Sequence, residues 1–376
     1  MKRPIVRLSS LQLTNIKNVK KGTIYMPNTV NKILSADKAE ILGIYGQNGS
    51  GKTAIVDALY FLQKVMIGAD LDQSLEDYMD MDSNVAEIFA DFNLFMNGIV
   101  FEIGYRLSLS REEKVVVISR ETLSGAKNEN GIRTNKTVFM DYQRDQTNTI
   151  FKPQKRLDEI LEENKGIKTD LIVARKMAEK SNCSYIFGES SRDIFCREYK
   201  NGFQQFSVII SSLFEFALKD LFVIRNTHSG VISANFVLPM AFRIENDNMG
   251  AKGDFTVSLT EPILVDEERK NLLETIVEQI NIVLYTIIPG LQVTIKNYGK
   301  QSLDDGEEGW KLELMSKREG MKEIPIRMES EGIIKIISIL NALIQAFGNP
   351  SICLVIDELD SGIFEYMLGE LLDIFK

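Results

Sequence analysis

Apolar and polar residues alternate along residues 85–92, and related short apolar segments follow at 99–109 and 114–122. A period of two places the apolar side chains on one face of a β-strand, so these segments predict neighbouring strands. Asn97 and Gly98 stand between the first two segments, and this pair favours the tight turn of a β-hairpin. The pattern therefore predicts an antiparallel β layer.

Residues 155–222 follow a helical period instead, with a break at 188–191. No heptad repeat persists there, so the pattern predicts a compact helical lobe rather than a long coiled-coil arm. Its phenylalanines could form an interaction surface or plain core, and their helical spacing favours the core. They are Phe203, Phe206, Phe214 and Phe216. A further helix is predicted at 272–283, and strands at 291–296 and 311–315.

A glycine-rich segment matches the phosphate-binding loop (P-loop) of nucleotide-binding proteins. It consists of Gly46, Gln47, Asn48, Gly49, Ser50, Gly51, Lys52 and Thr53. The apolar run 41–45 before it predicts a buried strand, and 54–62 after it predicts a helix. In that context the glycines let backbone amides and the helix N-terminus face a phosphate.

Two side chains of the P-loop carry the expected chemistry. Lys52 would reach the β- and γ-phosphates, and the Thr53 hydroxyl would bind Mg²⁺. The chain lacks the Asn-Lys-x-Asp motif with which GTPases recognise guanine. ATP is therefore the expected nucleotide.

A second apolar run, 352–356, ends in two acids, Asp357 and Glu358. The run predicts a central parallel strand, which would bring both carboxylates to the edge of the sheet beside the P-loop. Asp357 would hold Mg²⁺ through its water shell, and Glu358 would deprotonate or position the attacking water. An acid in this place favours a hydrolase over a small-molecule kinase, so we expect an ATPase.

An amphipathic helix is predicted to begin after Ser330, which stands at the N-cap position. Its apolar positions are Ile333, Ile336, Ile337, Leu340, Leu343, Ile344 and Phe347, with Lys335, Ser338, Asn341 and Gln345 on the opposite face. Ser330, the small Gly332 and the helix N-terminus form a candidate second anion site. Such a helix alone is usually structural. Ser330 stands 27 residues before Asp357, however, and this position favours the anion site.

This order of P-loop, Ser-x-Gly helix and Asp-Glu strand resembles the ATPase head of ATP-binding-cassette (ABC) proteins. It is most similar to the RecF, SMC and OLD (overcoming lysogenization defect) group, and within it to OLD-like bacterial ATPases of phage defence or DNA maintenance. Residues 6–19 resemble the first strand and turn of that group, in which Asn15 and Lys17 would touch the nucleotide. The resemblance covers residues 4–66 and 285–376.

The resemblance implies an α/β P-loop NTPase fold with a parallel core sheet, an antiparallel β layer and a helical insert. Residues 1–150 and 225–376 would form a discontinuous ABC-type head, and 151–224 the insert lobe.

The resemblance also implies a homodimer or higher homo-oligomer, in which two heads enclose two ATP molecules. Ser330 and Gly332 of one subunit would touch the γ-phosphate that Lys52 of the other subunit holds, and Asp360 would couple the two sites. Closure would control an effector nuclease or toxin subunit, or DNA. Two alternatives remain open: a RecF-like DNA-repair clamp, and a nucleotide-dependent scaffold that does not hydrolyse ATP.

One feature of the resembled heads is missing. They carry a histidine on the strand after the acid pair, whereas this chain ends 18 residues beyond Glu358. The single histidine, His228, is predicted in a loop. Residues 368–375 predict the helix after the acid pair, so we expect a truncated C-terminal end and assign no nuclease domain. In relatives a glutamine contacts Mg²⁺, and the candidates are Gln143, Gln146 and Gln154.

Composition predicts a cytoplasmic protein with no membrane partner, because 44% of residues are apolar without a long apolar run and the three cysteines form no pairing pattern. The net charge is −9, but residues 1–36 hold seven basic side chains and no acid, while 65–105 hold nine acids and no base. Lys17, Lys20 and Lys21 could therefore contact DNA phosphates, although solvated charges are the simpler interpretation. One histidine and unclustered cysteines argue against serine or cysteine hydrolases and zinc sites.

Overall fold

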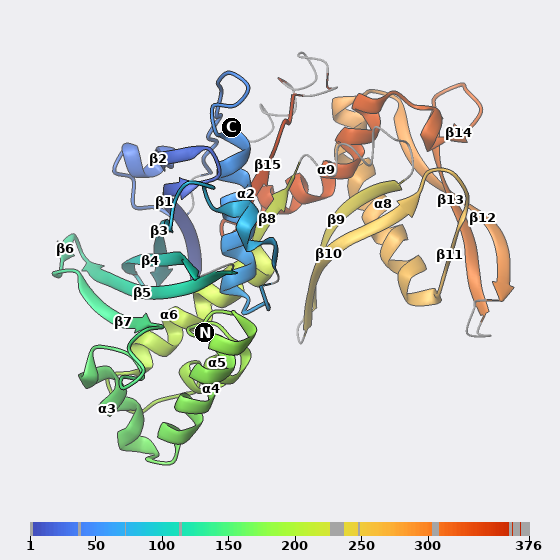
Figure 1. Cartoon of the computed structure of the whole chain (residues 1–376). Helices are drawn as coiled ribbons and strands as arrows, with labels where there is room; N and C mark the ends of the chain where they lie inside the picture. Colours follow the sequence, from blue (N-terminus) through green and yellow to red (C-terminus); the bar gives the residue numbers. More distant parts are fainter. Residues whose placement is uncertain are drawn as a thin grey trace. The chain divides into compact units, whose positions relative to one another are not determined.

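The protein has a mixed α/β fold (Figure 1). The computed structural model describes residues 3–36, 39–71, 73–112, 115–225, 237–246, 249–302 and 308–360, with Ile363 and Gly369. Its contacts divide the chain into two compact units. Unit 1 comprises Met1–Val223 and Pro350–Cys353, and unit 2 comprises Ile224–Asn349 and Leu354–Lys376.

Unit 1 is built on a seven-stranded sheet with the order β2-β1-β3-β4-β5-β6, in which β7 also pairs with β5. All of these pairs are antiparallel. The strands are β1 (Ile5–Ile16), β2 (Val19–Tyr25), β3 (Val85–Met96), β4 (Ile99–Glu112), β5 (Val115–Glu129), β6 (Ile132–Arg133) and β7 (Thr137–Gln143). The predicted antiparallel layer is confirmed.

The β3–β4 hairpin forms at the predicted place. Asn97 and Gly98 have φ angles of 50° and 79°, the left-handed conformation that a two-residue hairpin turn requires. Along β3 every second residue is buried, from Ala86 to Leu94. The alternation in the sequence therefore does mark the inner face of the sheet.

Helices pack against the sheet of unit 1, and several of them lie in the segment 154–220. The helical elements of unit 1 are α1 (Pro27–Val30), α2 (Lys52–Met66), η1 (Gln73–Tyr78), α3 (Gln154–Glu163), α4 (Ile167–Ser181), α5 (Glu189–Phe195), α6 (Gln204–Glu215) and η2 (Phe216–Asp220). Helices α2 and α6 both contact β1. Figure 1 shows α3–α6 gathered, in green, on the side of β5 and β7. Phe203, Phe206 and Phe216 are buried, as their spacing predicted, while Phe214 is half-buried under the Arg192 guanidinium. The boundaries proposed for a separate lobe stay a prediction.

A buried carboxylate ties this helical segment to the sheet. Glu121 of β5 has no exposed surface, and it accepts hydrogen bonds of 2.6 Å from the Tyr105 hydroxyl, the Ser184 hydroxyl and the Tyr185 amide. Burial raises the pKa of Glu121, since a low-dielectric site disfavours the charged form. The Asn182 side chain, just before Ser184, accepts a hydrogen bond from the Ile118 amide and donates one to the Val116 carbonyl of β5.

Unit 2 has its own sheets and core. Strands β9 (Val237–Asn246) and β10 (Met249–Ser258) pair antiparallel, and a second sheet has the order β11-β13-β12, with β14 paired to β13. These strands are β11 (Ile263–Val265), β12 (Leu291–Ser302), β13 (Glu308–Arg318) and β14 (Ile324–Pro325), and the helices are α8 (Glu267–Ile287), η3 (Ile326–Met328) and α9 (Glu331–Gly348). Buried residues of α8, α9 and these strands form one apolar cluster, which includes the predicted helix and strands.

Strands β8 (Leu221–Ile224) and β15 (Cys353–Ile356) form a two-stranded sheet, and each strand has residues in both units. A strand does form before the acid pair, as predicted. Within the described residues, however, it pairs with β8 in a two-stranded sheet, and the central place in a parallel core sheet predicted for it is not seen there. The buried strand predicted at 41–45 is wrong, because residues 41–47 have no regular secondary structure and Tyr45 is 85% exposed. A strand needs a hydrogen-bonded neighbour, and an apolar run cannot by itself show that one is present.

Candidate nucleotide-binding site

The P-loop leads directly into the N-terminus of α2. Gly51 is the N-cap residue, with φ 93°, and Gly49 has φ 82°. Both angles lie in the left-handed region that glycine adopts without strain. Lys52 and Thr53 are therefore the first two residues of a 15-residue helix, where the backbone amides have no partner within the helix and the helix dipole favours an anion.

Neighbouring side chains crowd two glycines of this loop. A Cβ on Gly51 would lie 2.6 Å from a Val19 methyl group, and one on Gly46 would lie 2.7 Å from the Ser50 hydroxyl. The loop is otherwise exposed from Gly46 to Ser50. A bare backbone around an accessible helix N-terminus fits a phosphate group.

The Lys52 side chain folds back over the loop. Its Nζ donates hydrogen bonds to the carbonyls of Gly46, at 2.6 Å, and Gln47, at 3.0 Å. A positive charge therefore lies within the loop, where the β- and γ-phosphates of a nucleotide would bind. Thr53 is exposed on the first turn, so its hydroxyl is accessible to Mg²⁺. These residues fit a Mg²⁺-nucleotide.

The turn between β1 and β2 supports the P-loop and the helix behind it. Asn18 Nδ2 donates to the Gly49 carbonyl at 2.6 Å. Lys17 forms an ion pair with Asp57, which lies buried on α2. Asn15 Nδ2 donates to the Val85 carbonyl at 2.9 Å.

These contacts differ from the nucleotide contacts that were predicted for Asn15 and Lys17. Of the two nucleotide-contacting candidates, Lys17 holds α2 and Asn15 holds the start of β3, whereas Asn18 contacts the P-loop itself. Asn18 follows Lys17 directly, but the sequence gives no sign of which side chain of a turn reaches the loop. Asn15 and Lys17 have left-handed φ angles of 55° and 50°.

In unit 2, the helix predicted after Ser330 is confirmed as α9. Ser330 is its N-cap, and the Ser330 side chain accepts a 3.5 Å hydrogen bond from the Ile333 amide. Ser330 is exposed and Gly332 is buried. The helix N-terminus is thus accessible at Ser330, in the way that an anion site requires.

The polar face predicted for α9 differs in the structure. Lys335, Ser338 and Asn341 are 6%, 4% and 1% exposed, so the helix is buried on this side as well. The helix forms as predicted, but its predicted polar face is wrong as a solvent-exposed face, because polar residues do not face water where another element packs over them. Lys335 in particular is buried against the acid pair.

The acid pair follows β15 directly. Asp357 is buried, and its amide donates to the Ile224 carbonyl at 2.9 Å. Glu358 is exposed and has φ 49°, a left-handed conformation that costs a residue other than glycine about 1 kcal/mol. The Lys335 amine donates a hydrogen bond to the Glu358 carbonyl. Burial lowers the pKa of Lys335, and the charges of Asp360, Glu358 and Asp357 oppose that shift.

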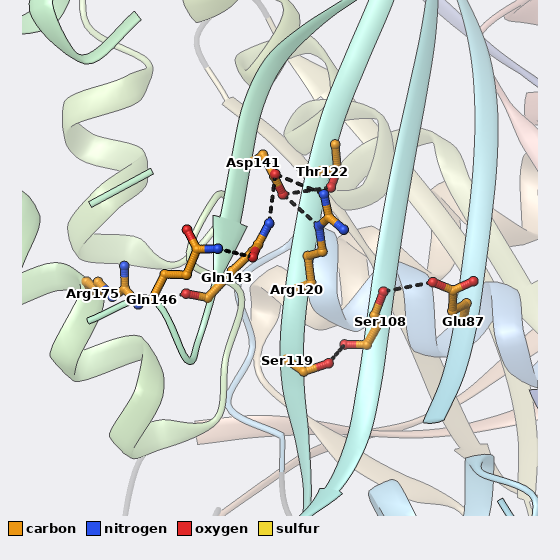
Figure 2. A network of polar contacts seen from close by, with 9 residues as sticks. All are labelled: Glu87, Ser108, Ser119, Arg120, Thr122, Asp141, Gln143, Gln146 and Arg175. Atoms are coloured by element: carbon orange, nitrogen blue, oxygen red, sulfur yellow. Dashed lines mark hydrogen bonds and ion pairs between the residues drawn. The ribbon is translucent and has the colours of Figure 1, made fainter. Parts of the chain in front are cut away.

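The three candidate glutamines bond to polar neighbours in unit 1. Figure 2 shows Gln143 donating to Asp141 at 3.0 Å and Gln146 donating to Gln143 at 2.5 Å. Gln154 donates to Asp158 at 2.8 Å. Asp141 also accepts two hydrogen bonds from Arg120. This network lies on the polar side of β5 and β7, and it singles out none of the three glutamines as a magnesium ligand.

The structure describes some of the remaining predicted features, and others lie outside the described residues. Lys20, a candidate for contact with DNA, pairs with Asp80 at 2.7 Å, so the basic and acidic stretches partly neutralise each other. His228 and residues 368 and 370–375 lie outside the described residues. Within the described ranges no helix is long and apolar enough to cross a membrane. The described part of the chain also holds no cluster of three or more histidine, cysteine, aspartate or glutamate side chains that could hold a metal.

Comparisons with known proteins point to the same region. Residues 41–166 match the family described as "AAA domain, putative AbiEii toxin, Type IV TA system". A comparison with curated protein sequences gives no match. The P-loop geometry and the similarity to an AAA domain identify a nucleotide-binding domain of the P-loop ATPase type.

Several solved structures are similar over most of the chain. An Smc head domain from Pyrococcus furiosus, with an extended coiled coil and bound to the C-terminal domain of ScpA, is 16% identical, with 99% of this chain and 86% of that chain covered and a TM-score of 0.40. The recombination mediator protein RecF with ATP is 11% identical, with 99% and 92% covered and a TM-score of 0.38. At these TM-scores the likeness carries nothing about individual residues of the site.

Proposed function

We propose that this protein binds ATP with Mg²⁺ and hydrolyses it. The backbone amides of the P-loop and the Lys52 amine would hold the phosphates, while Thr53 and Asp357 would hold Mg²⁺. Glu358 would act as the general base for the attacking water. The observation that carries the proposal is the P-loop itself, since the Lys52 amine lies within it at the N-terminus of α2.

The same proposal assigns supporting residues. Asn15, near the end of β1, and Lys17, just after it, would support the site. The Lys17–Asp57 ion pair favours a role of Lys17 in holding α2 rather than a direct contact with nucleotide. The accessible N-terminus of α9, with Ser330 and Gly332, would bind the γ-phosphate held by a partner subunit. ATP would thereby join two subunits, and hydrolysis would separate them.

We further propose that this cycle controls a partner, either an effector nuclease or toxin subunit or DNA, in phage defence or DNA maintenance. The description of the matched family, which names a toxin of a type IV toxin–antitoxin system, supports a role of this kind. The motif order of OLD-like ATPases supports it independently.

The test is phosphate release from ATP and Mg²⁺, with molecular mass measured by light scattering. The protein should hydrolyse ATP. Glu358→Gln should still bind ATP, but its turnover should be at least about a hundred-fold slower. The variant should also accumulate a species of doubled mass. ATP binding by the unmodified protein without any hydrolysis would leave only the scaffold alternative.

A further inference from the structure

A buried lysine contacts the backbone of the proposed general base. Lys335 lies in the second turn of α9 and is 6% exposed. Its amine donates a hydrogen bond to the main-chain carbonyl of Glu358. Burying an ammonium group is costly unless it is hydrogen-bonded and near negative charge. The hydrogen bond to the Glu358 carbonyl meets the first condition. The nearby carboxylates of Asp357, Glu358 and Asp360 meet the second.

The bonded carbonyl belongs to a residue in an uncommon conformation. Glu358 has φ 49°, and outside glycine such angles persist only where surrounding contacts hold them. The residue follows a short strand, β15, and its carboxylate side is exposed. Neither the strand nor side-chain packing therefore fixes the direction in which the carboxylate points.

We propose that Lys335 is a positioning residue for ATP hydrolysis, because it holds the Glu358 backbone in the left-handed turn that directs the carboxylate. This inference rests on the proposed function, in which Glu358 is the general base. The donor fixes the peptide plane after Glu358, and that plane together with φ sets the Cα–Cβ direction. Lys335 touches neither nucleotide nor water in this role.

Three variants test the inference. Lys335→Met removes the donor while keeping length and apolar contacts, Lys335→Arg keeps a cationic donor, and Ser338→Ala is the matched control one turn further along the buried side of α9. The Ser338 hydroxyl donates to the Lys335 carbonyl at 2.6 Å, within the helix. Turnover is measured per nucleotide-binding site by titration with a fluorescent ATP analogue, so that loss of folded protein does not count as loss of catalysis.

Lys335→Met should lower kcat by up to about a hundred-fold, the effect of misplacing a reacting group by about 1 Å, with KM and analogue affinity unchanged. Lys335→Arg should recover part of kcat, and Ser338→Ala should match the unmodified protein. In the Glu358→Gln background, Lys335→Met should have no further effect. A per-site kcat in Lys335→Met equal to that of the unmodified protein overturns the positioning role and leaves the proposed function intact. Absence of hydrolysis in the unmodified protein overturns the proposed function itself.

Discussion

The Asn18 side chain donates a 2.6 Å hydrogen bond to the carbonyl of Gly49, so the turn after the first strand is joined directly to the middle of the P-loop. The loop is otherwise exposed, and this bond is a restraint on it that comes from outside its own sequence. A backbone that must present several amides to one phosphate binds better when its conformation is set beforehand.

Asn18→Ala should therefore weaken ATP binding by about five-fold, the equivalent of one hydrogen bond of about 1 kcal/mol. Titration with a fluorescent ATP analogue measures the change. Asn31→Ala, at an exposed asparagine that ends α1, is the matched control and should bind as the unmodified protein does. Equal affinities for all three proteins would show that the bond to Gly49 does not organise the loop.

Lys52→Ala should reduce ATP affinity by about two orders of magnitude, since a charge-assisted hydrogen bond to phosphate contributes up to about 3 kcal/mol. Calorimetric titration with ATP and Mg²⁺ measures it. Lys64→Ala serves as the control, because Lys64 lies in the last turn of the same helix. The two variants should share the thermal stability of the unmodified protein, and similar affinities in both would remove Lys52 from the site.

Lys17→Met should lower the free energy of unfolding by about 1–2 kcal/mol, because it removes the cation that forms an ion pair with the buried Asp57 carboxylate. The Asp57 side chain is 9% exposed and the Lys17 side chain 34%, and the exposure of Lys17 keeps the expected loss below that for a fully buried pair. Urea denaturation measures the loss. In the double variant Lys17→Met/Asp57→Leu much of the stability should return, whereas simple additivity of the two losses would contradict the pairing.

Glu121→Gln should change how stability depends on pH. The pKa of Glu121 is raised by burial above its ordinary value of 4.5, so the folded protein holds this proton more tightly than the unfolded chain. The stabilisation that protonated Glu121 contributes is complete below the pKa of this group in the unfolded chain. It is lost as pH rises through the pKa of Glu121 in the folded protein. The unmodified protein should therefore have a higher free energy of unfolding than Glu121→Gln at pH 4.5, and this difference should be smaller near neutral pH.

Chemical denaturation at the two pH values measures this difference. A gap between the unmodified protein and Glu121→Gln that widens toward neutral pH would mean that the hydrogen bonds from Tyr105, Ser184 and Tyr185 outweigh burial, and that Glu121 is ionised in the folded protein.

Local features of this fold were predictable from the sequence because local spacing determines them. Alternation marked the buried face of β3, Asn97 and Gly98 marked its turn, and Ser330 marked the start of α9. Each of these signals acts within a few residues, where backbone conformation and capping are decided. The P-loop was predictable for the same reason, since its glycines and Lys52 are adjacent in the chain.

Features that depend on distant partners were not predictable. The apolar run 41–45 suggested a strand, but pairing requires a neighbour from elsewhere in the chain. Lys335 lies on the predicted polar side of its helix, whereas the residue that its amine contacts, Glu358, follows 23 residues later. Asn15 and Lys17 both have left-handed φ angles before Asn18. Asparagine favours that conformation but lysine does not, and the sequence does not show which side chain of the turn reaches Gly49.

The hydrogen bonds around Glu121 also limit how this protein can be shortened. Two of its donors, Ser184 and Tyr185, belong to the segment between α4 and α5. A deletion of residues 151–224 would therefore strip a carboxyl group in the sheet of these partners and expose the neighbouring ring of Tyr105, which stacks edge-on against Phe187. The helices are therefore not a detachable appendage, because the carboxyl group of Glu121 is buried in the sheet and takes hydrogen bonds from the segment that joins two of them.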